Sequence, residues 1–567
     1  MSPQPKSIPG RFLPLSPWLL PLLLAGCAGL PVGPQLELTM LTGSALGSSC
    51  QAWAATIRQD PPRLPDGTRV LLRCRSAGSG DVIAEMQQHA QAVLRAGGNP
   101  EDPRIPTLVS LDGEISEDLL RHRLQALAPS RSLIPPVGDA PALASSPMVL
   151  MTTPALAPGL RRADPYQALA RSADHRQLDA AAPAQQIRFV HTAPTRSNSG
   201  LQTLVAMVSE VSGKRPDQLT IADVQASAPA ITAIQNHITR YGASTDQLAR
   251  AMQRNGVFWA SVGSVYESSV VAVNGRRQPG QDPLVAVYPR ATFSSTMRAI
   301  LPTAPWVSPR ERQAALLLIE RLQQPALQKL VADQGLRPAN PAVPPRRVTA
   351  ALGVDPTAVY DSLRAPRPEV VEAMISLWRD ITKKPSRVAL VVDTSGSMAG
   401  AKLPAVQRSL QSYLAQIGPR DVVGLIDFDD VVRPPVVLRG GASGVPDSAA
   451  VLGRLQVGGT THLHDAVLAG RDWLRRTAQP GEILAVVVLT DGMDAGSKLT
   501  LDDLQAQLRR SVEGKGRINV FTVGFGDDSS GYNADVLRRL AEGNGGEFVE
   551  GDTLNIRRRM EDLQQSF

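Results

Sequence analysis

A hydroxyl-rich turn at residues 393–398 carries the residue types best suited to hold a metal ion. Asp393, Ser395 and Ser397 stand on alternate positions of its sequence, Asp-Thr-Ser-Gly-Ser-Met. The preceding run, 387–392, is almost continuously apolar and rich in Val, as in a strand buried on both faces. Apolar residues then recur at helical spacing, so the turn connects a strand to a helix. Oxygen-only ligands of this kind suit a hard divalent cation such as Mg2+.

Two later segments also place oxygen ligands directly after predicted strands. The loop 458–461 contains Thr460, and the Thr-Asp-Gly sequence at 490–492 contains Asp491. Strand-like runs alternate with amphipathic helices throughout this region, which predicts a doubly wound α/β sheet. Ligands of such sheets bind beyond the carboxyl ends of the strands, where all three segments are expected to lie.

Taken together, the three segments resemble the metal-ion-dependent adhesion site of von Willebrand factor type A domains, a resemblance that covers essentially all of 384–567. It implies a doubly wound, Rossmann-like domain that holds Mg2+, or another divalent cation such as Ca2+ or Mn2+. The ligands implied by the match are Asp393, Ser395, Ser397, Thr460 and Asp491. In that family an acidic residue of a protein partner completes the metal's coordination. An Asp-x-Ser-x-Ser sequence alone is also compatible with an ordinary helix cap.

Other acidic and histidine side chains near this site receive plainer interpretations. Asp427, Asp429 and Asp430 follow a predicted strand and are expected in a solvated loop rather than around a second metal. His462 and His464 flank the Thr460 loop without a third His or Cys close in sequence. We therefore expect them at the rim of the site and not as a zinc pair.

The N-terminal half also places hydroxyl-rich turns at the start of helices. Strands and helices alternate from residue 36 onward, and the turn at 76–80 contains Ser76 and Ser79. A second turn, at 194–200, contains Arg196 and Ser199. Backbone N–H groups at helix N-termini, and an arginine fork, are suited to an oxyanion. The alternative is that these small residues only cap their helices.

Residues 36–340 resemble the periplasmic solute-binding proteins of bacterial ABC importers. The resemblance is carried by the segments 76–80, 194–200, 241–242 with 255–256, 263–267, 284–289, 304–308 and 334–338. It implies two α/β lobes that clamp a small solute, with Ser76, Ser79, Arg196 and Ser199 as the candidate contacts. The turn departs from the Arg-x-Asp-x-Ser-Gly-Thr pattern of phosphate-binding members, because Asn198 replaces the Asp and Leu201 stands where Thr would be.

Charge differs between the two halves of the chain. The net charge is +7 overall, −2 for residues 384–567 and therefore +9 for the residues before them. A basic clamp domain favours a small anionic solute, or anionic lipid head groups, over a cation. The sequence lacks the interleaved aromatic and basic residues typical of nucleic-acid binding, so we expect no nucleic-acid partner.

The first residues have the pattern of an export signal. Lys6 and Arg11 precede a short apolar stretch that ends in Leu-Ala-Gly-Cys at Cys27. This tetrapeptide resembles a bacterial lipobox, which implies a lipid attached to Cys27 and anchorage to the cell envelope. If the envelope is Gram-negative, Ala28 resembles an outer-membrane sorting signal, which gives an outer-membrane or periplasmic location. The alternative is an ordinary signal peptide with small residues at its end.

The three cysteines are consistent with export. If Cys27 is lipidated, Cys50 and Cys74 remain as a pair in an oxidising compartment, and we predict a disulfide between them. Two buried free cysteines are the alternative.

The chain is too long for one core, and its proline-rich stretches mark the boundaries. The expected parts are a signal peptide (1–26), a lipidated tether (27–35), a solute-binding-like domain (36–340), a proline-rich linker with a docking helix (341–383) and the adhesion-type domain (384–567).

Two functions remain open. The first is a non-enzymatic lipoprotein that binds a protein through the metal site, and the second is an importer's receptor for an oxyanion or another small solute. An enzyme is not expected, because the sequence lacks a P-loop, a Gly-x-Ser-x-Gly elbow and a His-Glu-x-x-His motif.

Overall fold

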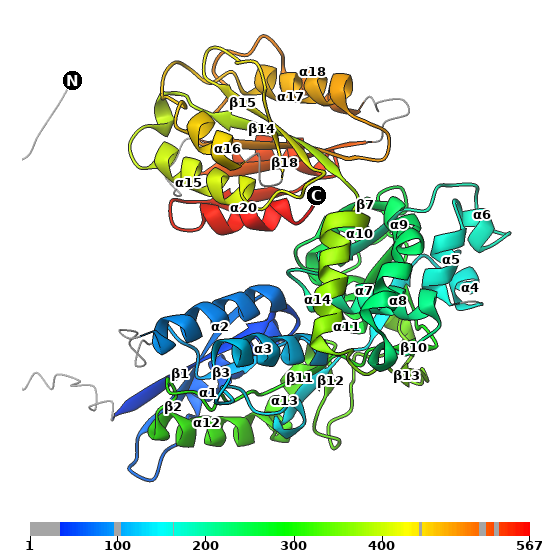
Figure 1. Ribbon diagram of the computed structural model, residues 1–567, viewed down its shortest axis with the longest axis vertical. Helices are drawn as coiled ribbons and strands as arrows, with labels where there is room; N and C mark the ends of the chain where they lie inside the picture. The colour runs from blue at the N-terminus through cyan, green and yellow to red at the C-terminus, as the bar shows by residue number, and fades with distance from the viewer. Residues whose placement is uncertain (1–33, 96–103, 163, 441–444, 510–516, 527–531) are drawn as a thin grey trace, which may run out of the picture.

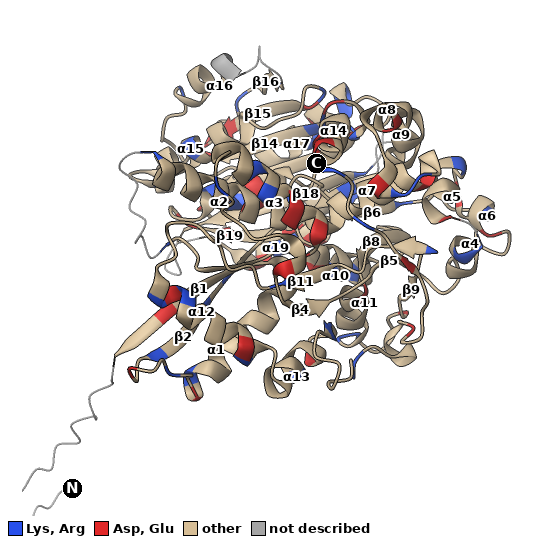
Figure 2. Cartoon of the chain, turned by 60° about the horizontal axis from the view of Figure 1, so that its bottom comes forward, with Lys and Arg blue, Asp and Glu red and all other residues tan. Residues whose placement is uncertain are grey.

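The computed structural model describes residues 34–95, 104–162, 164–440, 445–509, 517–526 and 532–567 (Figure 1). Cys27, the predicted lipidation site, lies outside them. In the described residues, no helix combines the length and apolarity needed to cross a bilayer. Basic and acidic segments are interspersed over the elements of both halves of the chain (Figure 2).

Lobe 1 of the N-terminal domain is built on a parallel sheet with the strand order β2-β1-β3. Its elements are β1 (Gln35–Gly43), α1 (Gly47–Gln59), β2 (Arg69–Ala77), α2 (Ser79–Leu94), β3 (Leu108–Ser110) and α3 (Glu114–Leu127). Two later helices, α12 (Pro309–Leu322) and α13 (Pro325–Asp333), return to this lobe. Buried Trp53 joins α13 to it, because its Nε1 donates a hydrogen bond of 2.9 Å to the Leu327 carbonyl.

Lobe 2 contains a mixed sheet with the order β7-β6-β8-β5-β9. Its strands are β5 (Met148–Thr152), β6 (Phe189–Thr192), β7 (Ile238–Gly242), β8 (Val262–Tyr266) and β9 (Val285–Val287). Its helices are α4 (Ala157–Arg161), α5 (Pro165–Arg171), α6 (His175–Leu178), α7 (Asn198–Ser212), α8 (Ile221–Ala226), α9 (Ala228–Asn236), α10 (Thr245–Asn255) and α11 (Glu267–Asn274). The edge strand β7 faces the C-terminal domain (Figure 1).

The lobes are joined by a small sheet in which β4 (Ala142–Ser145) lies between β11 (Thr296–Arg298) and β12 (Arg337–Pro338). The predicted linker differs from the expected extended spacer. Its residues Val348 and Val354 are buried in the core of lobe 2, and β13 (Asp361–Ser362) pairs with β10 (Ala291–Thr292). This proline-rich segment is therefore part of lobe 2. The free energy gained by burying its valines outweighs the tendency of prolines to keep a chain extended and separate.

The docking helix α14 (Pro368–Leu377) packs against α3, α7 and α8, and continues into a π-helical turn at Trp378–Thr382. Val370, Met374 and Trp378 bury its apolar face, as the sequence pattern predicts. Arg123 of α3 reaches the Glu372 carboxylate with hydrogen bonds of 2.8 and 3.1 Å. The helix is therefore fixed to both lobes of the domain.

The C-terminal domain is a six-stranded sheet with the order β16-β15-β14-β17-β18-β19, parallel except for the edge strand β16. Its strands are β14 (Ser386–Asp393), β15 (Val422–Phe428), β16 (Val436–Arg439), β17 (Ile483–Thr490), β18 (Ile518–Phe525) and β19 (Phe548–Gly551). Its helices are α15 (Lys402–Leu414), α16 (Val445–Leu452), α17 (Leu463–Thr477), α18 (Leu501–Arg509), α19 (Ala534–Glu542) and α20 (Ile556–Gln564).

The central strand β14 explains why both faces of this sheet are covered. Val388, Leu390 and Val392 belong to the core that contains α15 and α20, whereas Ala389 and Val391 belong to the core of α17, α18 and α19. Each buried Val or Leu side chain contributes about 1.5–3 kcal/mol relative to exposure. Because side chains pack on both faces of the strand, its last residue, Asp393, is held in place, and so is the turn that follows.

Candidate functional site

The turn after β14 holds its first carboxylate below the surface. The Asp393 side chain is 0% exposed, and burial raises its pKa above the ordinary aspartate value. Its Oδ1 accepts a hydrogen bond of 2.8 Å from the Ser395 N–H, and its Oδ2 accepts one from the Thr490 hydroxyl. Asp393 is thus tied to both its own turn and the end of the neighbouring strand β17.

Two serine hydroxyls and a second carboxylate lie beside it. The Oγ atoms of Ser395 and Ser397 are 3.1 Å apart, and the Ser397 hydroxyl donates to Asp491 Oδ1 at 2.6 Å. Adjacent ligands of an octahedral ion bound at 2.0–2.1 Å are separated by about 3.0 Å. The observed cluster of hydroxyl and carboxylate oxygens therefore fits a small divalent cation in both chemistry and spacing.

The Thr460 loop packs on the same turn. Gly396 N–H donates to the Gly459 carbonyl at 3.2 Å, and Gly458 N–H donates to the Thr394 carbonyl at 2.9 Å. Gly459 has φ +64°, and a Cβ there would lie 2.3 Å from Asp430 Oδ1, so this position requires glycine. Thr460 itself is exposed at the rim. The structure thus brings all five predicted ligand residues to one edge of the sheet.

Lys402 is a further residue of this site, and the sequence motif does not include it. It begins α15, and its ammonium donates to Asp491 Oδ2 at 2.5 Å and to the Ser397 carbonyl at 3.3 Å. Its position in the first turn of the helix that follows the predicted ligands is the sequence feature that points to a role at this site. A cation bound to a candidate metal ligand opposes a dication at the same place.

Replacing Lys402 with methionine is expected to strengthen Mg2+ binding about three- to tenfold, because the metal then meets no competing ammonium. Isothermal titration calorimetry of the full chain with MgCl2 measures the effect. Lys498→Met, on the loop before α18, serves as the control and should leave the affinity unchanged. Equal or weaker Mg2+ binding by Lys402→Met would refute the competition.

The neighbouring acidic cluster is solvated only in part: Asp430 is exposed, as expected, and Asp427 is half-buried. Asp429 is 4% exposed, and Arg433 donates to its Oδ2 at 2.6 Å. Arg433 also lies 3.3 Å from Asp427, so an arginine supplies the charge partner. His464 is buried with its Nδ1 3.0 Å from the Leu499 carbonyl. Over the described ranges, no three His, Cys, Asp or Glu side chains form a metal-binding group, so the candidate site depends on its hydroxyl oxygens.

In the N-terminal domain, the two predicted solute-binding turns contact each other directly. Gly80 N–H donates to the Arg196 carbonyl at 2.9 Å. A Cβ on Gly78 would lie 2.4 Å from that carbonyl oxygen, and one on Gly80 would lie 2.1 Å from the Thr195 oxygen. The lobes therefore meet backbone to backbone at the turns where a solute was expected.

Arg196 does not present its guanidinium to an open cleft. Its Nη2 donates to Asp81 Oδ2 and to Asp562 Oδ1, both at 2.6 Å, and its side chain is 12% exposed. Asp81 belongs to lobe 1 and Asp562 to α20 of the C-terminal domain. The arginine that was expected to bind an oxyanion is instead bound by two carboxylates of its own chain.

The candidate serines are engaged in different ways. Ser199 Oγ lies within hydrogen-bond distance of three hydroxyls, those of Thr192 (2.8 Å), Ser197 (3.0 Å) and Thr245 (2.6 Å). Ser76 is exposed, and its carbonyl accepts a hydrogen bond of 3.4 Å from Arg558. The structure therefore does not gather these two side chains into one cradle.

Ser79 lies beside a buried carboxylate that the sequence analysis did not identify. Its Oγ accepts a hydrogen bond of 3.2 Å from the Asp112 N–H. The Asp112 side chain is 1% exposed, its Oδ2 accepts from the Ala45 N–H at 3.4 Å, and its Oδ1 has no partner in the described part of the chain. Burial raises the pKa of Asp112 to about 7. An internal carboxylate thus faces the helix N-termini that were expected to bind an external anion.

The predicted cysteine pair is joined in the structure. Cys50 of α1 and Cys74 of β2 form a disulfide with their Cα atoms 5.8 Å apart. The bond fastens the first helix of lobe 1 to the edge strand of its sheet.

Comparisons with known proteins agree with this architecture. Residues 82–359 match the family model for bacterial extracellular solute-binding proteins, and residues 388–565 match that of the von Willebrand factor type A domain. Among curated proteins, human inter-alpha-trypsin inhibitor heavy chain H4 is 30% identical over 173 residues, covering 29% of this chain and 18% of that protein. The pig heavy chain H2 is 23% identical over 169 residues, with coverages of 29% and 18%. The chain thus spans less than a fifth of these relatives.

Solved structures resemble each half separately. The sulfate-binding protein SubI of Mycobacterium tuberculosis H37Rv is 17% identical, with a TM-score of 0.38 over 60% of this chain and 96% of that one. A von Willebrand factor type A protein of Catenulispora acidiphila is 18% identical, with a TM-score of 0.28 over 33% of this chain and 43% of that one. Both predicted domain types and the α/β fold class are confirmed. The chain combines a bacterial extracellular solute-binding domain with a von Willebrand factor type A domain that follows it.

Proposed function

We propose that this protein is a non-enzymatic cell-envelope lipoprotein whose von Willebrand factor type A domain binds a protein partner through a divalent cation. The observation that supports this most directly is the cluster of Ser395, Ser397 and Asp491 oxygens next to buried Asp393. The cluster lies at the carboxyl ends of β14 and β17, where ligands of doubly wound sheets bind.

The residues of the site have separate roles in this proposal. Asp393 and Asp491 supply the negative charge that a dication needs, and Ser395, Ser397 and the rim residue Thr460 supply neutral oxygens. The bound Mg2+ offers a Lewis-acidic position to a carboxylate. The partner's contribution is therefore an exposed Asp or Glu side chain, and Ca2+ or Mn2+ are the other cations that suit these ligands.

The location follows from the first domain and from the N-terminal sequence. An extracellular solute-binding domain implies export. The Cys50–Cys74 disulfide supports an oxidising compartment. We propose a lipid on Cys27 as the anchor, which places the metal site outside the cytoplasm, on the outer membrane or the periplasmic face if the envelope is Gram-negative.

A receptor for an oxyanion is the second candidate, favoured by the net charge of +9 before residue 384. The contacts of Arg196 with Asp81 and Asp562, and the internal carboxylate of Asp112, argue against it. In this function Ser76, Ser79, Arg196 and Ser199 would still be the contacts, after the lobes part. Stabilisation by a solute that is lost in Arg196→Gln would favour the receptor over the adhesion function.

The metal-dependent function is tested by capture of partners from a cell-envelope extract, with and without Mg2+. The Asp393→Ala variant is expected to lose Mg2+ binding by calorimetry and every Mg2+-dependent captured protein, while it stays folded. The control is Asp502→Ala on α18, whose side chain is 87% exposed and pairs with Arg539 rather than with a ligand residue. Wild-type capture or wild-type Mg2+ affinity in Asp393→Ala would refute the proposal.

A further inference from the structure

The two domains meet along the edge strand β7 of lobe 2. Tyr241 N–H donates to the Ser566 carbonyl at 3.2 Å, and its hydroxyl accepts from the Lys384 N–H at 3.0 Å. Trp259 Nε1 donates to the Gly545 carbonyl at 3.2 Å. Backbone and side-chain hydrogen bonds thus define this junction, whose residues are not those of the candidate metal site.

A cavity of about 180 Å³ lies within the junction, and four cationic side chains line it. Arg188 and Arg240 come from lobe 2, and Lys384 and Arg517 from the C-terminal domain. Glu482 is the lining carboxylate, and Arg387 already occupies it with two hydrogen bonds of 2.8 Å. The described lining of the cavity therefore carries an excess of positive charge, contributed by both domains.

Arg240 is the most buried of these cations. Its side chain is 7% exposed and lies between the Trp259 and Phe521 rings, with Cζ 5.0 and 4.8 Å from the ring centroids. Such stacking covers the guanidinium faces and leaves the in-plane N–H groups for a ligand. Among the described residues Nη2 has no hydrogen-bond partner, and burial lowers the pKa of Arg240 to about 9.

Among the cavity-lining residues that the structure describes, the other cations also have no carboxylate partner. Arg188 donates to the Phe258 carbonyl at 2.6 Å, and Lys384 Nζ donates to the carbonyls of Ile238 and Asn236 at 2.7 and 3.2 Å. Neutral carbonyls orient these groups without cancelling their charge. Burial lowers the pKa of Lys384 to about 8, and burial together with Arg188 lowers the pKa of Arg517.

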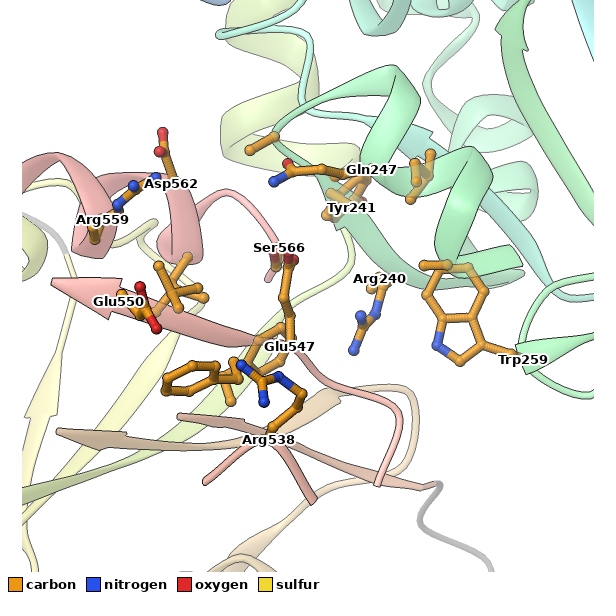
Figure 3. A pocket seen from close by; sticks show the side chains of 18 residues that line it. Arg240, Tyr241, Gln247, Trp259, Arg538, Glu547, Glu550, Arg559, Asp562 and Ser566 are labelled. Atoms are coloured by element: carbon orange, nitrogen blue, oxygen red, sulfur yellow. The ribbon is translucent and has the colours of Figure 1, made fainter. Parts of the chain in front are cut away.

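Arg240 also lines a neighbouring cavity of about 440 Å³, shown in Figure 3. There it lies near Glu547 and Arg538, and Glu550 and Asp562 line the same space (Figure 3). The larger cavity is lined by three cations, Arg240 among them, and three carboxylates, and Glu547 there is the carboxylate that acts on Arg240, whereas Arg188, Lys384 and Arg517 line the smaller cavity alone. The smaller one, with its unbalanced cations, is the better place for an anion.

We propose that the 180 Å³ cavity binds a tetrahedral oxyanion, phosphate or sulfate, held jointly by Arg240, Arg188, Lys384 and Arg517. The volume equals that of several waters at about 30 Å³ each, which admits the ion with some hydration. Arginine N–H groups match oxyanion geometry, and the ion relieves repulsion between cations of different domains. The anion therefore also stabilises the contact between the solute-binding domain and the von Willebrand factor type A domain.

The full chain is titrated calorimetrically with inorganic phosphate, inorganic sulfate and glycerol phosphate. Arg240→Gln is expected to weaken binding roughly ten- to a hundredfold, because this is the usual effect of losing a hydrogen bond to a charged group. Lys384→Gln, at the cavity edge, should weaken it in the same direction and serves if Arg240→Gln misfolds. Binding of phosphate but not of glycerol phosphate assigns the site to free ions; equal binding of both assigns it to a terminal phosphate group.

Arg310→Gln is the matched control, since Arg310 is exposed on α12 and pairs only with lobe 1 residues. It should bind phosphate as the wild type does. The proposal is overturned if the wild type binds neither phosphate nor sulfate up to about 10 mM. It is equally overturned if Arg240→Gln and Lys384→Gln bind normally, or if Arg196→Gln alone abolishes binding, which would place the ion in the interlobe cleft.

Discussion

At about pH 8, the Asp112→Asn variant is expected to have a free energy of unfolding about 4 kcal/mol higher than the wild type. Asp112 is 1% exposed, and its Oδ1 has no hydrogen-bond partner among the described residues. Its folded-state pKa is raised to about 7 by burial, against about 3.9 in an unfolded chain. Ionised Asp112 therefore destabilises the fold, and the amide removes that cost.

Because the pKa of Asp112 is raised in the folded state, the difference in stability between wild type and variant depends on pH. Above about pH 7 the folded protein bears the full cost of the buried charge. As the pH falls from about 7 to about 4, the folded state takes up a proton that the unfolded state does not, so stability is regained. Below about pH 4 both states are protonated, and the difference between wild type and variant disappears.

Urea unfolding of both proteins across this pH range measures the difference. Glu117 and Glu210 also have raised pKa values, but they are common to both proteins and cancel. Asp333→Asn, at an exposed position on α13, is the control and should give no pH-dependent difference. A wild-type-minus-variant difference that stays constant with pH would contradict the burial of an ionised Asp112.

Loss of the Cys50–Cys74 disulfide is expected to lower the free energy of unfolding by about 3.5 kcal/mol. The cysteines are 24 positions apart, so the bond closes a loop of intermediate length in the unfolded chain. Opening that loop restores conformational entropy to the unfolded state. The bond lies in lobe 1, whose described residues form a sheet of three strands.

Denaturant unfolding of the Cys50→Ala/Cys74→Ala variant measures this loss. Wild-type protein with its disulfide reduced by dithiothreitol is the matched comparison, because its side chains are unchanged. Both should be destabilised by similar amounts, whereas the reductant should not affect the double variant. A loss below about 1 kcal/mol in both samples would refute the entropic role.

The C-terminal site was predictable because its geometry is mostly local. The run 387–392 forms most of β14, and the turn after it places Asp393, Ser395 and Ser397 by short-range geometry alone. Asp491 follows because parallel strands end at one edge of a sheet. The ionic contact of Lys402 with Asp491 needed the orientation of α15, which spacing does not provide.

The solute-binding half was predictable in fold but not in its contacts. Alternating strands and helices gave the two lobes, yet the partners of Arg196 lie 115 and 366 residues away in sequence. Asp112 went unnoticed because a single Asp after a short strand has no distinguishing pattern. The burial of Val348 and Val354 likewise depends on lobe 2 and not on the proline-rich sequence around them.

The guanidinium of Arg196 links three parts of the chain: its own lobe 2, lobe 1 through Asp81, and α20 of the C-terminal domain through Asp562. Separation of the lobes breaks the hydrogen bond to Asp81, and the same nitrogen also holds the bond to Asp562 of α20. The free energy of opening the cleft and the free energy of packing α20 against Arg196 are therefore coupled, and such coupling acts equally in both directions. A change that favours one arrangement of the cleft therefore alters the stability of the contact with α20, and a change in that contact alters the cleft by the same free energy.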